Sequence, residues 1–232
     1  MIFRQLFDPE SSTYTYILGD PLTQEALIID SVREQAERDL RLLSELGLKL
    51  KYILETHLHA DHITGADLLR SATGAKVAIS RAAGVRCADI ALEEGTELKI
   101  GTKVLRAIAT PGHTNTCMSF FIAGMVFTGD TLFVRDVGRT DFQEGSNEKM
   151  FESVTRKLFA LPDETMVYPA HDYKGNHVST IGEEKAFNLK VGAGKKLEEF
   201  GSLMASMRLA QPKKIHIALP ANLNCGKETA VS

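Results

Sequence analysis

The sequence predicts an α/β fold in which two mixed β-sheets pack together and helices cover both outer faces, an αββα sandwich. Three observations support this expectation. Strand-like segments occur in two groups along the 232 residues, and segments with helical spacing of apolar residues interrupt both groups. Side chains of the metal-binding type follow several strand ends, which would gather them along one edge of the sandwich.

The first group of strands starts near the N-terminus. Apolar, β-branched and aromatic residues predict three strands, at residues 2–7, 13–18 and 25–30. The turn signals Asp8-Pro9 and Gly19-Asp20-Pro21 separate these strands. We therefore expect a meander at the start of the chain.

Residues 33–46 have the spacing of an amphipathic helix that lies on one face of a sheet. The apolar positions of this helix recur at Ala36, Leu40 and Leu43. Gly47 is a natural stop for it, because glycine adopts the left-handed conformation that ends many helices. A strand is expected next at 49–55, followed by a short helix at 65–72 that ends at Gly74.

The second group of strands alternates with turns. It is expected at residues 76–80, 97–100, 103–109, 118–122 and 125–128. A second amphipathic helix at 148–161 ends before Pro162, and a strand at 166–172 follows it. Beyond these elements, the pattern predicts a helix at 196–207 and a strand at 215–219.

Length and composition indicate one ordinary globular domain. A chain of 232 residues can bury about 70% of the surface of its unfolded state. We expect a single domain over residues 1–232, with a short C-terminal extension after about residue 180. The net charge is −3 and both signs are interleaved, so no basic surface is available for nucleic acid or an anionic membrane. A small-molecule partner is therefore expected.

The N-terminus and the cysteines indicate a reducing compartment. The first residues enter a strand pattern without a basic leader, and no apolar run has the length of a membrane span. We expect a cytoplasmic protein, or a mature organellar one. Cys87, Cys117 and Cys225 are far apart and odd in number, which favours buried free thiols over a disulfide framework. Of the three, Cys225 is expected to be the most exposed.

The densest group of metal-binding side chains follows the strand predicted at 49–55. Within the six positions from 57 to 62 lie His57, His59, Asp61 and His62. Their nitrogen and oxygen atoms suit one or two metal ions. His113, Asp130 and His171 also lie just after apolar segments. The alternative is a solvated polar loop that is rich in histidine by chance. The recurrence of ligand-type residues after strand ends favours a metal site.

The stretch His57-Leu58-His59-Ala60-Asp61-His62 has the form H-x-H-x-D-H. It resembles the metal-binding motif of the metallo-β-lactamase superfamily, whose later single ligands match His113, Asp130 and His171. Because all parts occur in order between residues 57 and 171, the resemblance is specific. It implies the αββα sandwich and a metal at its edge.

Within that superfamily, the chain is most similar to the persulfide dioxygenases over nearly its whole length. The informative segments are Gly138-Arg139-Thr140-Asp141-Phe142-Gln143, Tyr168-Pro169-Ala170-His171-Asp172-Tyr173, Pro220-Ala221-Asn222 and Cys225-Gly226. Two positions depart from the pattern of the family, because Leu58 replaces a frequent cysteine and Asn188-Leu189 replaces Asn-Pro.

The resemblance implies an oxidoreductase that uses O2 and water to convert glutathione persulfide into sulfite and glutathione. One Fe(II) per chain would be held by His57, His113 and Asp130, the facial triad of two histidines and one carboxylate. The other motif residues would hydrogen-bond to water and to the ligands of the iron: His59, Asp61, His62 and His171.

Glutathione has two carboxylates, which an arginine can bind with both arms of its guanidinium group. Arg139 is the candidate for that role, and the resemblance adds Tyr173, Lys174 and Asn176. An alternative for Arg139 is a structural ion pair with Asp141. A homodimer is compatible with this interpretation.

Two other functions remain open from the sequence. All seven ligands of a dinuclear hydrolase are present, so a dizinc enzyme that hydrolyses acyl-glutathione thioesters, like glyoxalase II, has the same ligand set. A metal- or sulfur-sensing protein without turnover could also keep the fold. A complete triad and an arginine suited to the substrate argue against the sensor, whereas the ligand list alone does not separate the hydrolase from the dioxygenase.

Overall fold

Two six-stranded β-sheets form the framework of the protein in a computed structural model that describes residues 1–207, 209–212 and 214–227. The chain divides into two compact units. Unit 1 comprises residues 1–92, 98–104 and the described residues after 210, and unit 2 comprises residues 93–97 and 105–210. Each unit has its own helices and its own apolar core.

The first sheet contains the strands β1 (Ile2–Asp8), β2 (Thr13–Gly19), β3 (Glu25–Ile29), β4 (Lys49–Leu54), β5 (Lys76–Ser80) and β6 (Ile90–Leu92), in that order. The strands β1, β2 and β3 are antiparallel neighbours, which confirms the predicted meander. From β3 to β6 the pairing is parallel. The sheet is therefore mixed.

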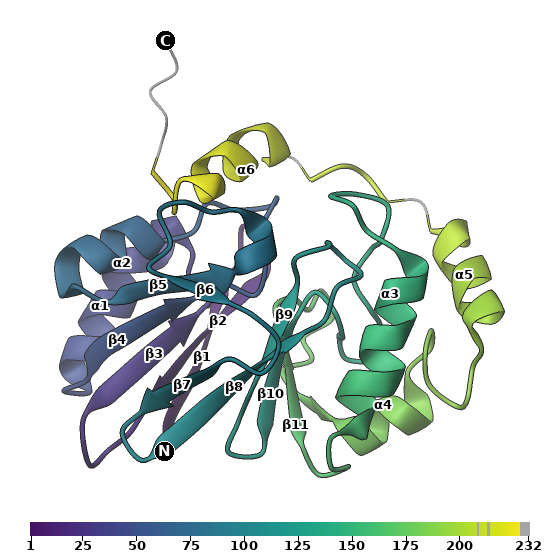
Figure 1. The fold of residues 1–232 in the computed structure, drawn as a ribbon, viewed down its shortest axis with the longest axis horizontal. Coiled ribbons are helices and arrows are strands. Elements are labelled where there is room, and N and C mark those ends of the chain that lie inside the picture. The colour runs from purple at the N-terminus through teal and green to yellow at the C-terminus, as the bar shows by residue number, and fades with distance from the viewer. Residues whose placement is uncertain (208, 213, 228–232) are drawn as a thin grey trace. The chain divides into compact units, whose positions relative to one another are not determined.

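Helices cover one face of the first sheet (Figure 1). The helical elements of unit 1 are η1 (Arg33–Gln35), α1 (Ala36–Glu45), α2 (Ala66–Thr73), η2 (Arg81–Ala83) and α6 (Ile215–Leu223). Leu43 of α1 and Leu69 of α2 pack against Ile17, Ile28 and Ile53 of the strands. The burial of this apolar face stabilises the helices more than their intrinsic propensity does.

The second sheet has the order β12-β11-β10-β9-β8-β7. Its strands are β7 (Glu97–Ile100), β8 (Lys103–Ala109), β9 (Met118–Ile122), β10 (Met125–Gly129), β11 (Met166–Pro169) and β12 (Ser179–Thr180). The pair of β10 and β11 is parallel, whereas β8, β9 and β10 pair antiparallel, so this sheet is mixed as well. The two shortest strands, β6 and β12, were missed by the sequence pattern.

The helical elements of unit 2 are α3 (Asn147–Glu152), η3 (Ser153–Lys157), η4 (Leu158–Ala160), α4 (Ile181–Phe187) and α5 (Leu197–Ser206). The helix predicted at 148–161 is thus one helical run with a π-helical middle and a 3-10 end. Val154 and Ile181 pack against Val126 and Val167 of the sheet. The helix predicted at 196–207 is confirmed as α5, and α4 was not predicted.

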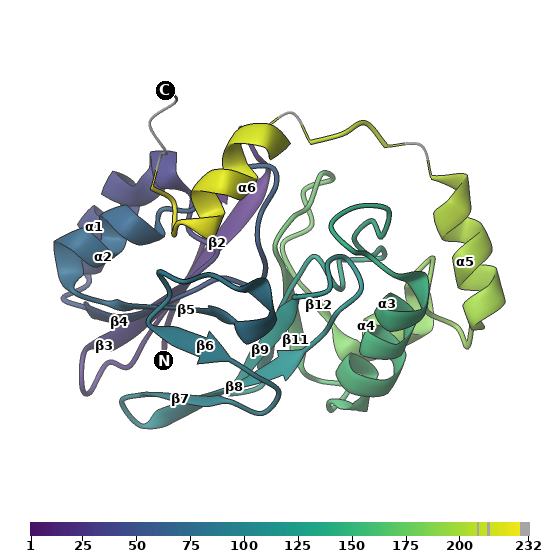
Figure 2. The same ribbon diagram turned by 45° about the horizontal axis from the view of Figure 1, so that its top comes forward.

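The strand predicted at residues 215–219 is wrong, because this segment begins the helix α6. A short apolar run does not distinguish a strand from a buried helix. Ala218 and Ala221 lie one turn apart on the buried face of α6 and pack against Ile63, so tertiary contact decides the conformation. Figure 2 shows α6 within unit 1 as a yellow helix.

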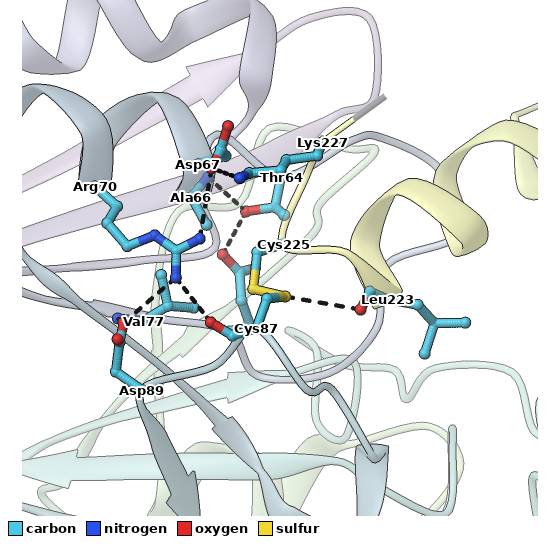
Figure 3. The surroundings of a disulfide bond; sticks show 11 residues. Thr64, Ala66, Asp67, Arg70, Val77, Cys87, Asp89, Leu223, Cys225 and Lys227 are labelled. Carbon is cyan, nitrogen blue, oxygen red and sulfur yellow. Dashed lines mark hydrogen bonds and ion pairs between the residues drawn. A yellow bond between two sulfur atoms is a disulfide. The ribbon is translucent and has the colours of Figure 1, made fainter. Parts of the chain in front are cut away.

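The expectation of three free thiols is also wrong. Cys87 and Cys225 form a disulfide with a Cα–Cα distance of 6.1 Å (Figure 3). Cys117 is a buried thiol outside this disulfide. Cys225 is only 2% exposed, contrary to the exposed position expected for it. The two cysteines are 138 residues apart, so no local sequence pattern indicates that the C-terminal segment returns to the loop before β6.

Among the residues that the structure describes, no helix has both the length and the apolar character needed to cross a lipid bilayer.

The buried carboxylate of Asp39 in α1 predicts a pH-dependent stability. Burial raises the pKa of Asp39 from 3.8 to about 6, although Arg38 partly offsets the effect. Between these pH values the folded state binds more protons than the unfolded state, so the free energy of unfolding falls as the pH rises. The substitution Asp39→Asn removes this loss and should stabilise the protein at pH 7.5 by about 1 to 3 kcal/mol.

Urea unfolding of both proteins at pH 7.5 and pH 3.5 measures this effect. The difference between them should largely disappear at pH 3.5, where Asp39 is protonated in the folded state. Equal stabilities at pH 7.5 would contradict the raised pKa.

Candidate metal centre

In unit 1, the loop between β4 and α2 carries the histidine-rich motif. Its start is held by Asp30, which directly follows β3. The backbone amide and the hydroxyl of Thr56 donate hydrogen bonds of 2.7 and 2.9 Å to the two carboxylate oxygens of Asp30. Because β3 and β4 are parallel neighbours, both strands end at the same edge of the sheet. The loop therefore leaves the sheet from a fixed position.

His59 lies at the centre of the loop. Its ring centroid is 4.2 Å from that of His57 and 4.3 Å from that of His62. Its Nε2 atom lies 3.1 Å from Asp30 Oδ1 and 3.5 Å from Glu55 Oε2. These carboxylates fix the orientation of the ring, which leaves Nδ1 directed toward the rest of the motif, 3.9 Å from Asp61 Oδ1.

Of the carboxylates around His59, those of Asp30 and Glu55 are buried and that of Asp61 is half-buried. Burial by itself lowers the pKa of His59, but the carboxylates of Asp30, Glu55 and Asp61 outweigh that effect and raise this pKa well above its ordinary value. Burial raises the pKa of Glu55. The negative charge that favours a proton on the imidazole of His59 also favours a metal cation near this loop.

In unit 2, Asp130 directly follows β10 and lies between two histidines. Its Oδ2 atom is 3.5 Å from His113 Nε2, and its Oδ1 atom is 3.5 Å from His171 Nε2. The Nδ1 atom of His113 lies 2.8 Å from the carbonyl oxygen of Arg139, to which it donates a hydrogen bond. This contact fixes the tautomer of His113 and leaves the lone pair of Nε2 facing Asp130.

Several of these atoms are buried without a hydrogen-bond partner within the described part of the chain. They include His59 Nδ1, His62 Nε2 and Asp130 Oδ1. A buried polar atom without a partner costs about 1 to 3 kcal/mol, so such groups usually have a ligand. Imidazole nitrogens and carboxylate oxygens are ligands for a divalent transition metal. The donor residues of each unit therefore fit a metal ion.

Each unit brings its own predicted site residues together. His59, Asp61 and His62 offer ligand atoms within 4.8 Å of one another. Asp30 and Glu55 form a second such group with His59, and neither was predicted as a site residue from the sequence. Both residues directly follow a strand, so the rule that identified Asp130 could have found them.

A pocket of about 200 Å³ opens beside Asp130 and His171 in unit 2. Three of the predicted glutathione-binding residues line it: Arg139, Tyr173 and Lys174. The ring of Tyr173 is 73% exposed and stacks on His171 with centroids 6.0 Å apart. Asn176 does not line this pocket, because its side-chain amide donates a hydrogen bond to Asp172.

Arg139 is engaged within unit 2. Its guanidinium group pairs with both carboxylate oxygens of Asp141, at 2.6 and 2.8 Å, which is the ion pair considered from the sequence. It also donates to the carbonyl oxygen of Ala210 and lies 4.2 Å from the ring centroid of Phe142. The hydrogen bond from Arg139 holds the pKa of Asp141 below its usual value.

Comparison with known proteins identifies the chain's relatives. The profile of the metallo-beta-lactamase superfamily matches residues 8–171. The mitochondrial persulfide dioxygenase ETHE1 of Mus musculus is 46% identical, over 100% of this chain and 91% of the mouse protein. The Homo sapiens protein of the same name is 45% identical, over 99% and 90%. The crystal structure of ETHE1 from Myxococcus xanthus has a TM-score of 0.95 at 51% identity, over 98% of this chain and 100% of that chain.

The chain therefore belongs to the metallo-beta-lactamase superfamily, and the predicted fold class of two mixed sheets flanked by helices is confirmed. Within the superfamily, it belongs to the family of the persulfide dioxygenases. The superfamily and the clusters of histidine and aspartate together support a metal-binding protein.

Gly138 tests how the backbone positions Asp130. A β-carbon at Gly138 would lie 2.1 Å from the carbonyl oxygen of Asp130, so the substitution Gly138→Ala must displace one of the two segments. We expect a loss of about 1 to 3 kcal/mol of stability, as for overpacking in a core, and a lower metal content of the purified protein.

The matched control is Gly201→Ala in α5, where an added β-carbon meets no atom within 4 Å. The metal content and the thermal stability of this control should equal or exceed those of the wild type. A Gly138→Ala protein with full metal content would show that this contact does not position Asp130.

Proposed function

We propose that this protein oxidises the terminal sulfur of glutathione persulfide with O2 and water, which yields glutathione, sulfite and two protons. The observation that carries the proposal is the identity of 45–46% with curated persulfide dioxygenases along the whole chain. The buried nitrogen and oxygen donors that follow β4 and β10 support it, because the reaction requires a redox-active metal.

The proposed cofactor is one Fe(II) per chain, held by His57, His113 and Asp130. Two histidines and one carboxylate leave open coordination positions on the iron. When bound, Fe(II) supplies a site at which a sulfur donor and O2 meet and exchange electrons. His59, Asp61, His62 and His171 would then orient water and the ligands through hydrogen bonds.

The side chains of the protein prepare this site. The carbonyl oxygen of Arg139 keeps the proton of His113 on Nδ1, so that Nε2 presents a lone pair. His171 lies next to Oδ1 of Asp130 and limits the rotation of the carboxylate. Thr56 donates to Asp30, whose other carboxylate oxygen lies 3.1 Å from Nε2 of His59. These contacts reduce the reorganisation needed for metal binding.

The pocket of unit 2 is the proposed site for the glutathione part of the substrate. Lys174 offers a cation for one carboxylate, and the exposed ring of Tyr173 offers a surface beside His171. Arg139 can bind the other carboxylate if the substrate shares or replaces the contact with Asp141. Asn176 would contribute through the turn that it forms with Asp172.

The comparisons support the dioxygenase rather than the dizinc thioesterase, since the curated relatives at 45–46% identity are persulfide dioxygenases. A cytoplasmic location remains a prediction. The Cys87–Cys225 disulfide is unusual for that compartment, where cellular reductants keep most thiols reduced.

The ligand assignment predicts different outcomes for two groups of histidine and aspartate variants. His113→Ala and Asp130→Ala should lose the iron and lower the rate of O2 consumption with glutathione persulfide by at least about a thousandfold, which corresponds to roughly 4 kcal/mol. His171→Ala should slow the reaction and retain iron. Anaerobic metal analysis and an oxygen electrode measure both properties, and loss of iron from His171→Ala would contradict its assigned role.

The substrate assignment predicts a change in KM. Because a charge-assisted hydrogen bond contributes about 1.5 to 3 kcal/mol, Arg139→Gln should raise the KM for glutathione persulfide about tenfold or more with a smaller change in kcat. The control is Asp141→Asn, which removes the charge that pairs with Arg139 and leaves the contacts of its guanidinium group with Ala210 and Phe142. If both variants raise KM equally, Arg139 serves only the structural ion pair.

A further inference from the structure

The side chain of Asn222 bridges three positions of the histidine-rich loop in unit 1. Its amide nitrogen donates hydrogen bonds of 2.8 Å to the carbonyl oxygen of His59 and 2.9 Å to that of His62. Its amide oxygen accepts a hydrogen bond of 2.9 Å from the backbone of Thr64. Asn222 is 4% exposed, so water does not readily replace these contacts.

The three bridged groups lie in a loop, outside the strands and the helices that satisfy most backbone groups. A buried backbone group without a partner destabilises the conformation that contains it. Only a side-chain amide combines two donor hydrogens with an acceptor oxygen in one planar group. The chemistry of Asn222 therefore matches the two carbonyl oxygens and the one amide that it contacts.

The chain around Asn222 is held on both sides. Before it, Ala218 and Ala221 of α6 pack against Ile63 of the same loop. After it, the carbonyl oxygen of Cys225 accepts a hydrogen bond of 3.0 Å from the backbone amide of Asp67 (Figure 3).

The disulfide to Cys87 adds a covalent attachment to the segment before β6. Arg70 holds the Cys87 end of the disulfide, because its guanidinium group donates a hydrogen bond of 2.7 Å to the carbonyl oxygen of Cys87 (Figure 3). Gly226 packs so closely that an added β-carbon would lie 2.2 Å from the carbonyl oxygen of Thr64.

We propose that Asn222 is a positioning residue for the metal-binding loop, and that the Cys87–Cys225 disulfide keeps Asn222 in place. This inference rests on the proposed function, since it assigns the loop to the iron site. Asn222 fixes the backbone at residues 59, 62 and 64, and thereby fixes the directions of His59 and His62. A segment 138 residues beyond Cys87 thus completes a loop near the start of the chain.

The test compares Asn222→Asp with Asn224→Asp. The first variant keeps the shape of the side chain, but it places an acceptor oxygen against two carbonyl oxygens. The second introduces the same charge at an exposed residue two positions away. Three readouts are used: amide hydrogen exchange of residues 57–64, the rate at which a chelator removes Fe(II) from the holoenzyme, and kcat with KM for glutathione persulfide.

Asn222→Asp should accelerate exchange in the loop and the release of Fe(II) by about tenfold or more. It should lower kcat and leave KM within about twofold, because the substrate pocket proposed above belongs to unit 2. Asn224→Asp should match the wild type in every readout. Wild-type exchange and Fe(II) release in Asn222→Asp, or equal effects in both variants, would overturn the inference.

Two further variants keep the test decisive. Asn222→Ser replaces Asn222→Asp if the latter does not fold. It retains a small polar group and should show smaller changes in exchange, Fe(II) release and kcat of the same sign. Cys87→Ser leaves Asn222 intact and should accelerate exchange in residues 57–64, whereas wild-type exchange would overturn the role of the disulfide. Hydrogen exchange in the loop does not depend on turnover. A protein without dioxygenase activity would therefore refute the proposed function, whereas the role of Asn222 would still be decided by the exchange rates of residues 57–64.

Discussion

The burial of imidazole and carboxylate atoms that lack a protein partner is the constraint on which the site depends. His59 Nδ1, His62 Nε2 and Asp130 Oδ1 are withdrawn from water without a hydrogen bond from any described residue. Such atoms destabilise a folded chain unless a ligand compensates them. In the proposed arrangement a divalent metal ion would compensate Asp130, and water held beside the metal would compensate His59 and His62, which turns a local loss of stability into a binding site.

The donors stay in place because residues outside the motif hold the loops that carry them. Asp30 binds the start of the histidine-rich loop, and Asn222 binds its middle and end. The carbonyl oxygen of Arg139 fixes the tautomer of His113 in unit 2. Strands supply only the point at which each loop leaves a sheet. The directions of the ligands are set by hydrogen bonds between segments that are distant in sequence.

The sequence predicted those parts of the structure whose signals are local. The meander, the helices that pack with Leu43 and Val154, and the ligand motif after β4 follow from periodicity and spacing. The disulfide and α6 were not predictable in this way. Cys225 meets Cys87 only after the chain has returned across 138 residues, and Ile215–Leu223 is helical because its small residues meet Ile63.

Arg139 shows a different limit of sequence reasoning. Its residue type indicated a carboxylate partner correctly, since an arginine fork suits a carboxylate. The sequence could not decide whether that carboxylate belongs to a substrate or to Asp141, and the structure places Asp141 on both arms of the fork. Residue type predicts the chemistry of a contact, whereas the partner depends on geometry.

The most direct test is an anaerobic titration of the metal-free protein with Fe(II). The bound iron and the free energy of unfolding are measured at each step. A ligand that binds only the folded state stabilises it by RT ln(1 + [L]/Kd), so stability keeps rising with free ligand after the site is full. We expect the amount of bound iron to saturate at one Fe(II) per chain and the free energy of unfolding to rise with free Fe(II). Saturation at two metal ions per chain, or no gain in stability, would contradict the single ferrous site.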